Sequence, residues 1–180
     1  MKIVFRVVLL AALAAVGVWL WTVFFPSPEK IIRRQLSEVA KRVSFTADEG
    51  TLARLADAQS LAGYFATNVE VNINTREGDR QNFVGRDQIT QAALAARSAV
   101  GSLNVKFLDV DVTVAPDKQS ATADLTVDAN VAGQPEAIVQ EVKITLQKIA
   151  GQWLITRVAT VRILSILNFE PAHALRIVDA

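Results

Sequence analysis

Few side chains in this sequence are suited to catalysis. His173 is the only histidine, and no carboxylate stands at triad-like spacing from it. Imidazole titrates near neutral pH and is the most common general base, but a triad or a metal site needs further partners. We therefore expect His173 to be exposed or to cap a helix. The chain has no cysteine, which excludes disulfides, thiolate metal sites and cysteine nucleophiles.

A pair of carboxylates is the next candidate. Asp109 and Asp111 lie two positions apart in a segment of alternating apolar and polar residues, so both should point to one face of a strand. Paired carboxylates bind cations or act as acid and base. Their positions are the polar ones of the alternation, which favours a solvated outer face and pairing with Lys143 or Arg157 on other strands. We predict neither a metal site nor a cofactor.

A third group of side chains is a candidate for ligand binding. Tyr64 is the only tyrosine, and a buried phenol requires a hydrogen-bond partner. Together with Asn72, Asn74 and Arg97 it is predicted to line the mouth of a cavity, and Trp153 is predicted to form one wall. The alternative is that Tyr64 packs between a helix and the sheet and that Trp153 belongs to the core. The predicted ligand-binding set is Tyr64, Asn72, Arg97 and Trp153.

The N-terminal residues 1–25 are predicted to be a membrane anchor. Residues 7–25 carry no charge, and Thr22 is their only polar residue. Nineteen residues at helical rise span about 28 Å, close to the thickness of the bilayer core. A cleaved signal peptide is the alternative, since Lys2 and Arg6 resemble its basic start. Its apolar region is usually shorter, however, and no small-residue cleavage site follows this one.

The charges flanking the predicted span give conflicting signals on orientation. Lys2 and Arg6 favour an N-terminus inside the cell and an exported domain. Positive residues also follow the span, where they normally mark the cytoplasmic side. We predict a single-pass protein of the bacterial inner membrane with a periplasmic domain. The alternative is a cytoplasmic domain held against anionic lipid by the basic residues Lys30, Arg33, Arg34, Lys41 and Arg42.

The overall charge balance argues against nucleic-acid binding. The 180 residues contain 19 Lys and Arg against 18 Asp and Glu, whereas a nucleic-acid surface needs a strongly basic patch. Residues 26–180 have the size of one domain and are enough to bury a core.

Three amphipathic helices are predicted after the anchor. A juxtamembrane helix occupies residues 26–45, with Ser27 as N-cap and apolar residues at helical spacing. A second helix begins at the capping-box pattern of Thr46 and Glu49 and runs to about residue 66. A third helix runs from 85 to about 99. The predicted buried stripe of the second helix is Leu52, Leu55, Ala62 and Phe65, and that of the third is Ile89, Ala92, Ala93 and Ala96.

The strands are predicted from alternating apolar residues. Segments 69–73 and 81–84 form a hairpin around a turn at 76–79. Four longer strands follow as an antiparallel meander, at 103–114, 121–131, about 142–146 and 153–164. The alternation changes phase at Phe107 and Leu108, which predicts a β-bulge. Residues 165–180 are predicted to be a short helix or a tail that straps the domain. This order predicts an α+β domain in which a curved antiparallel sheet packs on three helices around a cavity.

Three short motifs reinforce this prediction. They are Ala62-Gly63-Tyr64-Phe65-Ala66 before the first strand, Gly85-Arg86-Asp87-Gln88-Ile89 at the third helix, and Gly151-Gln152-Trp153-Leu154-Ile155 at the last strand. In this order they resemble the nuclear transport factor 2-like (SnoaL-like, cystatin-like) superfamily over residues 46–164. The resemblance implies a cone-shaped domain, often a dimer.

The same resemblance bears on function. Isomerases of this superfamily carry a catalytic carboxylate on the first strand, where this chain has Asn72-Ile73-Asn74. The absence of that acid argues against ketosteroid-isomerase-like chemistry. Membrane-anchored relatives include assembly factors of type IV secretion and mycobacterial proteins associated with lipid import. This chain resembles both in layout, with an anchor followed by one domain.

We therefore expect a membrane-tethered, non-enzymatic interaction or assembly domain that forms a homodimer through the face of its sheet. Two alternatives stay open. One is a binder of a small apolar or lipidic ligand in the cone cavity. The other is a SnoaL-like isomerase or dehydratase.

Overall fold

The computed structural model describes residues 27–74 and 80–164. The predicted anchor, the turn at 76–79 and the tail with His173 lie outside these residues. Within them no helix is long and apolar enough to cross a membrane. The elements are α2 (Pro28–Val43), α3 (Thr51–Ala62), β1 (Phe65–Asn74), β2 (Arg80–Val84), α4 (Arg86–Ala99), β3 (Leu103–Val114), β4 (Ser120–Val131), β5 (Ile138–Ile149) and β6 (Gln152–Leu164).

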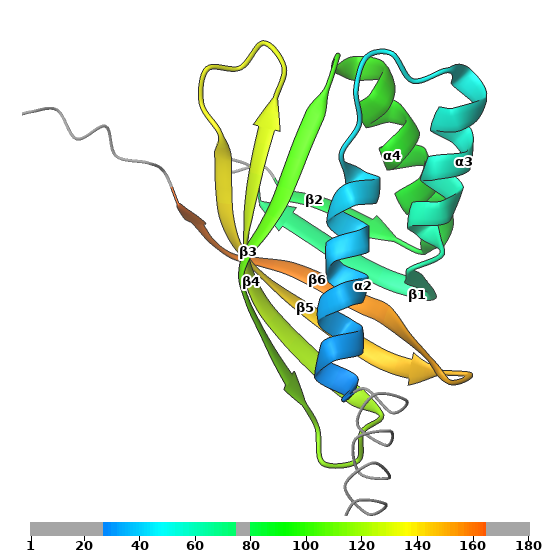
Figure 1. Ribbon diagram of the computed structural model, residues 1–180, viewed down its shortest axis with the longest axis vertical. Coiled ribbons are helices and arrows are strands. Elements are labelled where there is room, and N and C mark those ends of the chain that lie inside the picture. Colours follow the sequence, from blue (N-terminus) through cyan, green and yellow to red (C-terminus); the bar gives the residue numbers. More distant parts are fainter. Residues whose placement is uncertain (1–26, 75–79, 165–180) are drawn as a thin grey trace, which may run out of the picture.

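One curved six-stranded sheet forms the body of the domain, with the strand order β2-β1-β6-β5-β4-β3 (Figure 1). The predicted hairpin and the meander of four antiparallel strands are both present. The prediction of a wholly antiparallel sheet is wrong, because β1 pairs with β6 in parallel. The hairpin and the meander are separated by α4, and this long connection lets the first and last strands meet side by side in the same direction.

The core lies between the sheet and the three helices. Ile32 and Leu36 of α2 are fully buried, and so is Leu146 of β5. Val69 of β1 and Ile155 of β6 join the same apolar cluster. The predicted apolar stripe of α2 is therefore confirmed, and this helix packs into the core that the strands form.

A bulge bends β3 near the predicted position. The pairing of β3 with β4 shifts register between Leu108 and Asp111, and Asp109 adopts φ 50°. The extra residue explains why the apolar alternation changes phase inside one strand. The sequence prediction of a bulge is confirmed.

The second helix differs from its prediction. α3 begins after Gly50, so Thr46 is not its N-cap, and Phe65 belongs to β1. The backbone of Phe45 exchanges two hydrogen bonds with Leu103, at 2.9 and 3.0 Å, which holds the chain extended just before residue 46. Leu52 is 84% exposed and Leu55 is 43% exposed, so the predicted buried stripe is wrong at both positions.

Candidate functional site

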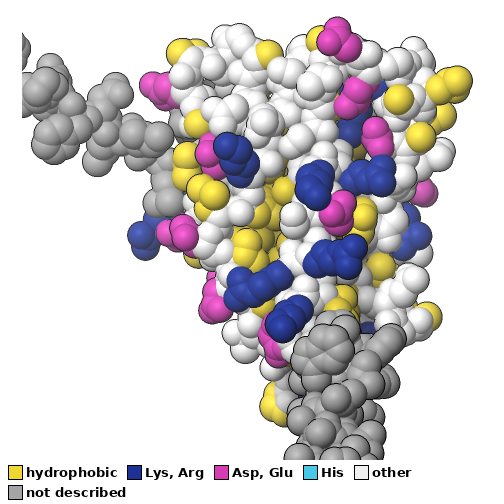
Figure 2. All heavy atoms as spheres, in the orientation of Figure 1, with side chains coloured by type: hydrophobic (Ala, Val, Ile, Leu, Met, Phe, Trp, Pro, Cys, Tyr) yellow, Lys and Arg dark blue, Asp and Glu magenta, His cyan; other side chains and the backbone are white. Residues whose placement is uncertain are grey.

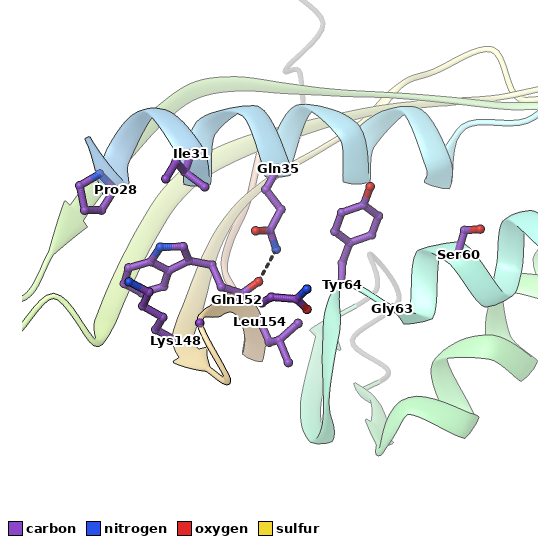
Figure 3. A pocket seen from close by; sticks show the side chains of 11 residues that line it. Pro28, Ile31, Gln35, Ser60, Gly63, Tyr64, Lys148, Gln152 and Leu154 are labelled. Carbon is purple, nitrogen blue, oxygen red and sulfur yellow. Dashed lines mark hydrogen bonds between the residues drawn. The ribbon is translucent and has the colours of Figure 1, made fainter. Parts of the chain in front are cut away.

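A groove lies between the first half of α2, the junction of α3 with β1, and the turn from β5 to β6 (Figure 3). Its volume is about 700 Å³. Most of its surface is apolar. Its polar side chains include two glutamine amides and one lysine ammonium group. The lining residues are Pro28, Ile31, Gln35, Ser60, Gly63, Tyr64, Lys148, Gly151, Gln152, Trp153 and Leu154.

Two residues of the predicted ligand-binding set, Tyr64 and Trp153, meet in this groove. Tyr64 precedes β1, and Trp153 is the second residue of β6, the strand parallel to β1. The Ile155 amide donates a 2.9 Å hydrogen bond to the Tyr64 carbonyl, which fixes the two segments side by side. The Gln35 side chain donates a 2.8 Å hydrogen bond to the carbonyl of Trp153 and so ties α2 to the groove. Trp153 itself is 5% exposed and forms part of the core.

A second hollow of about 510 Å³ lies on the other side of Tyr64. It shares Ile31, Gln35 and Tyr64 with the first groove, so the two form one continuous surface, which we call the α2 groove. The second part carries more charged side chains, being lined by Lys30, Arg34 and Glu38 as well as by the shared residues.

Arg97 lies elsewhere, buried between α4 and the end of α2. One guanidinium nitrogen donates a 2.7 Å hydrogen bond to the Arg42 carbonyl. The Nε atom is 3.6 Å from a carboxylate oxygen of Glu49, and the guanidinium lies 5.1 Å from the centre of the Phe45 ring. Arg97 is 4% exposed and does not line the α2 groove. These contacts hold the segment between α2 and α3 against α4.

Asn72 is also outside the groove. It stands in β1 opposite Asn82 of β2 and Ala159 of β6, on the face of the strand opposite to Val71. The neighbouring Asn74 carbonyl accepts a 3.2 Å hydrogen bond from the Gln140 side chain. The structure thus brings together two of the four predicted ligand-binding residues. A ligand-binding role for Asn72 and Arg97 stays a prediction.

Asp109 and Asp111 line a hollow of about 210 Å³ on the outer face of the sheet. The prediction that Lys143 or Arg157 pairs with these two carboxylates is wrong. Asp111 lies 3.8 Å from Arg33 of α2, whereas Lys143 pairs with Asp124 at 3.3 Å. Arg157 pairs with Glu70, at 3.9 Å. Among the described residues no group of three or more histidine or acidic side chains is placed to hold a metal ion.

A further groove of about 640 Å³, not predicted from the sequence, separates α2 from β3. Its floor is apolar and includes Val105 and Phe107, and the cations Arg33, Lys41 and Lys106 surround it. Figure 2 shows this face, with basic side chains around an apolar strip. Arg33 donates to the Val110 carbonyl. The Ser44 hydroxyl accepts a 2.9 Å hydrogen bond from the Val105 amide. Side chains of α2 and its C-cap therefore satisfy polar groups along the free edge of β3.

The α2 groove is suited to binding. Its titratable groups are cations, one phenol and one carboxylate, that of Glu38. A hydrogen bond from Lys41 and the charge of that lysine hold the pKa of Glu38 below its ordinary value. The carboxylate is therefore ionised at neutral pH and cannot donate a proton. Among the described lining residues no acid stands beside a base in the arrangement that general acid–base catalysis needs.

Comparisons with known proteins establish the fold. The chain matches no protein-family profile, and no curated protein is significantly similar in sequence. Among solved structures, the yeast complex of the deubiquitinase Ubp3 and its Bre5 cofactor superposes with a TM-score of 0.58 at 17% identity, over 77% of this chain and 98% of that one. A scytalone dehydratase-like protein from Novosphingobium aromaticivorans gives 0.56 at 15% identity, over 76% and 84%.

A nuclear transport factor 2-like protein of unknown function from Pseudomonas putida gives a TM-score of 0.51 at 12% identity, over 71% of this chain and 83% of that one. The described domain therefore has the nuclear transport factor 2-like, or cystatin-like, fold. At these identities the likeness establishes the architecture, and proteins with very different functions share it.

Proposed function

We propose that this chain is a membrane-tethered, non-enzymatic interaction or assembly domain. The observation that carries the proposal is the filling of the space between sheet and helices by apolar side chains, including Leu36, Leu146 and Trp153. In an enzyme we would expect a pocket in this space between sheet and helices, lined by titratable groups. Here the one buried charged side chain among the described residues is Arg97, which is engaged by Arg42, Glu49 and Phe45.

The tether is proposed from the sequence. The uncharged residues 7–25 are long enough to span a bilayer, and α2 starts three residues after the last of them. We propose a single span in a bacterial inner membrane with the domain in the periplasm. The cytoplasmic orientation is the competing outcome of the test.

The absence of cysteine makes the topology directly measurable. A single Gln134→Cys substitution places a thiol in the exposed turn between β4 and β5. Treatment of intact cells with a maleimide that cannot cross the inner membrane should label the full chain if the domain is periplasmic. Labelling only after lysis would show that the domain is cytoplasmic and would overturn the proposed orientation. Release of the chain from membranes by carbonate would overturn the tether.

A homodimer through the outer face of the sheet is the specific assembly that we propose. This face is mostly polar but exposes Leu108 of β3 and Val161 of β6, which are 43% and 61% exposed. The neighbour Bre5 is the cofactor in a complex with the deubiquitinase Ubp3. If the sheet face forms the dimer, Val161→Asp should convert it to a monomer, because burial of a carboxylate without a partner is costly. Lys106→Gln, on β3 beside the groove between α2 and β3, is the control and should leave the dimer intact.

A small apolar or lipidic ligand is the second candidate. The groove around Tyr64 and Trp153 favours ligand binding, since a volume of about 700 Å³ with mainly apolar walls matches typical small-molecule sites. An isomerase or dehydratase activity is the third candidate, supported by the fold of the scytalone dehydratase-like neighbour alone.

Native mass spectrometry of the full chain, released from nanodiscs without added ligand, separates these candidates. A dimer, or a complex with a second protein, without additional small mass is the expected result. A bound species with the mass of a metabolite or a lipid, retained by the chain but lost in Tyr64→Ala, would replace the interaction proposal by ligand binding.

A further inference from the structure

Three segments that are distant in sequence meet at one end of the domain. They are the first two turns of α2, the β3–β4 turn and the β5–β6 turn, which lie together at the lower end in Figure 1. The Lys148 amide donates a 2.8 Å hydrogen bond to the Gln119 carbonyl, which joins the two turns. Pro28 and Ile31 of α2 line the same groove as Lys148. We call this end the base of the domain.

The base is cationic. Each of its three segments contributes exposed lysines or arginines, namely Lys30, Arg34, Lys118 and Lys148. None of the four forms an ion pair with a carboxylate of the described residues. Two acids lie nearby. Asp117 accepts a 2.9 Å hydrogen bond from the Gln119 amide, and Glu29, in the first turn of α2, interacts with the charge of Lys118, so cations still outnumber acids at the base.

Apolar side chains are exposed among these cations. Ile31 of α2 is 41% exposed, and Ile149, at the end of β5, is 42% exposed. Lysine and arginine side chains together with exposed isoleucines are the composition that binds the interface of an anionic bilayer, where cations meet phosphate groups and apolar side chains reach the acyl boundary.

The chain geometry places this base next to the membrane. The predicted span ends at Phe25, and α2 begins at Pro28. Three residue steps of extended chain reach about 10 Å. This distance is similar to the Debye length, which is about 8–10 Å at physiological salt. The cations of the base are therefore within electrostatic range of the headgroups if residues 7–25 span the bilayer.

We propose that the base docks on anionic lipid headgroups and so fixes the orientation of the domain relative to the bilayer. The proposal rests on the proposed tether. It goes beyond the tether because a span alone does not fix the orientation of the domain. Docking holds the α2 groove, whose lining includes Pro28, Ile31 and Lys148, at the membrane surface.

Single-cysteine probes test this orientation. The full chain is placed in nanodiscs of zwitterionic lipid or of the same lipid mixed with phosphatidylglycerol, each containing a lipid with a headgroup quencher. A fluorophore on Gln119→Cys reports on the base, and one on Gln134→Cys, in the turn at the opposite end, is the control. Anionic lipid should increase quenching at position 119 and leave position 134 unchanged.

Salt and charge variants complete the test. At about 1 M salt, where the Debye length is about 3 Å, the lipid-dependent difference at position 119 should disappear. Lys118→Gln combined with Lys148→Gln should remove most of it. The matched pair Lys106→Gln with Lys143→Gln, which removes equal charge outside the base, should keep it. Inorganic phosphate should reduce the quenching at position 119 no more than chloride of equal ionic strength does, because the proposed ligand is a lipid surface.

The outcomes separate the two proposals. Equal quenching at position 119 in neutral and anionic nanodiscs, with the chain firmly inserted, overturns docking and leaves the tether standing. If the matched pair Lys106→Gln with Lys143→Gln loses as much lipid-dependent quenching as the base variant, the assignment of lipid binding to the base is overturned. A chain that does not insert overturns both proposals. Thermal melting of every variant checks that the exposed substitutions leave the fold intact.

Discussion

Gln35 and Trp153, 118 positions apart, are joined by a 2.8 Å hydrogen bond from the glutamine side chain to the tryptophan carbonyl. The bond connects the middle of α2 to the second residue of β6, at the floor of the α2 groove. It holds the helix above the sheet at the point where the indole is buried. One side-chain contact thus links the helical wall of the groove to the strand that carries the buried indole.

Removing this bond should cost little but measurable stability. Gln35→Ala is expected to lower the free energy of unfolding by about 1 kcal/mol, since one partly exposed hydrogen bond is lost and water can reach the carbonyl. Denaturant titration of the detergent-solubilised full chain gives the value. Ser37→Ala, on the exposed side of α2, is the control and should stay within about 0.5 kcal/mol of the original chain. Equal effects of the two substitutions would show that the bond contributes nothing.

Truncation of the tryptophan should be much more damaging. Trp153 is 5% exposed within the main apolar cluster, and Trp153→Ala is expected to cost about 3–5 kcal/mol because it leaves a large cavity. Leu52→Ala is the comparison, since Leu52 is 84% exposed, and should change stability by less than about 0.5 kcal/mol. A Trp153→Ala chain that melts at the original temperature would contradict the placement of β6.

The sequence predicts the repetitive parts of this fold well. Period-two alternation identified β3 to β6, and the phase change at Phe107 and Leu108 located the bulge, because burial of one sheet face imposes the pattern. The start of α3 was mispredicted because Thr46 and Glu49 match a capping box by residue type alone. The pairing of Phe45 with Leu103, which holds that segment extended, involves residues far apart in the sequence.

The candidate site was harder to predict than the fold. Tyr64 and Trp153 line the same groove, and each lies within a motif that is recognisable in the sequence, while their ligand-binding role stays a prediction. Gln35 gave no signal, since a glutamine on a helix is usually solvated. From the sequence, Arg97 is grouped with Tyr64, Asn72 and Asn74 at the mouth of a cavity, whereas the structure buries it elsewhere. Its burial depends on the Arg42 carbonyl and the Phe45 ring, contacts between segments that local pattern does not reveal.

Arg97 should therefore act on stability. Arg97→Ala removes the hydrogen bond to Arg42 and leaves the half-buried Glu49 without its cation. The expected loss is about 2–4 kcal/mol, somewhat less than for a fully buried pair because water reaches Glu49. Arg34→Ala, which is exposed, serves as the control. An Arg97→Ala chain of unchanged stability would contradict this structural role.

Two glycines should respond differently to the same substitution. Gly85, before α4, has φ 86° and ψ 156°, a region that only glycine occupies easily, and an added Cβ would lie 3.4 Å from the Thr67 carbonyl oxygen. Gly85→Ala should cost about 1–3 kcal/mol. Gly50, before α3, has φ −66° and open space around it. In Gly50→Ala the reduced freedom of the unfolded chain offsets a poorer N-cap, so stability should change by less than about 0.5 kcal/mol. Equal losses would contradict the backbone conformation at Gly85.

The titration of Glu29 reports on the geometry of the base. A hydrogen bond from its own backbone N–H and one from the Ser27 hydroxyl lower the pKa of this carboxyl below the ordinary value of 4.5, and the charge of Lys118 lowers it further. Because the folded-state pKa is lower than the unfolded one, the ionised carboxylate favours the fold above pH 4.5, and this contribution is lost as the pH falls through the folded-state pKa.

Ser27→Ala should raise the pKa of Glu29 toward 4.5, and Lys118→Gln should raise it by less, as followed by carboxyl-carbon NMR of the full chain in micelles. Lys106→Gln should leave it unchanged. A Glu29 pKa that ignores Lys118→Gln would separate the β3–β4 turn from the start of α2, and with it would remove one of the three segments that form the cationic base.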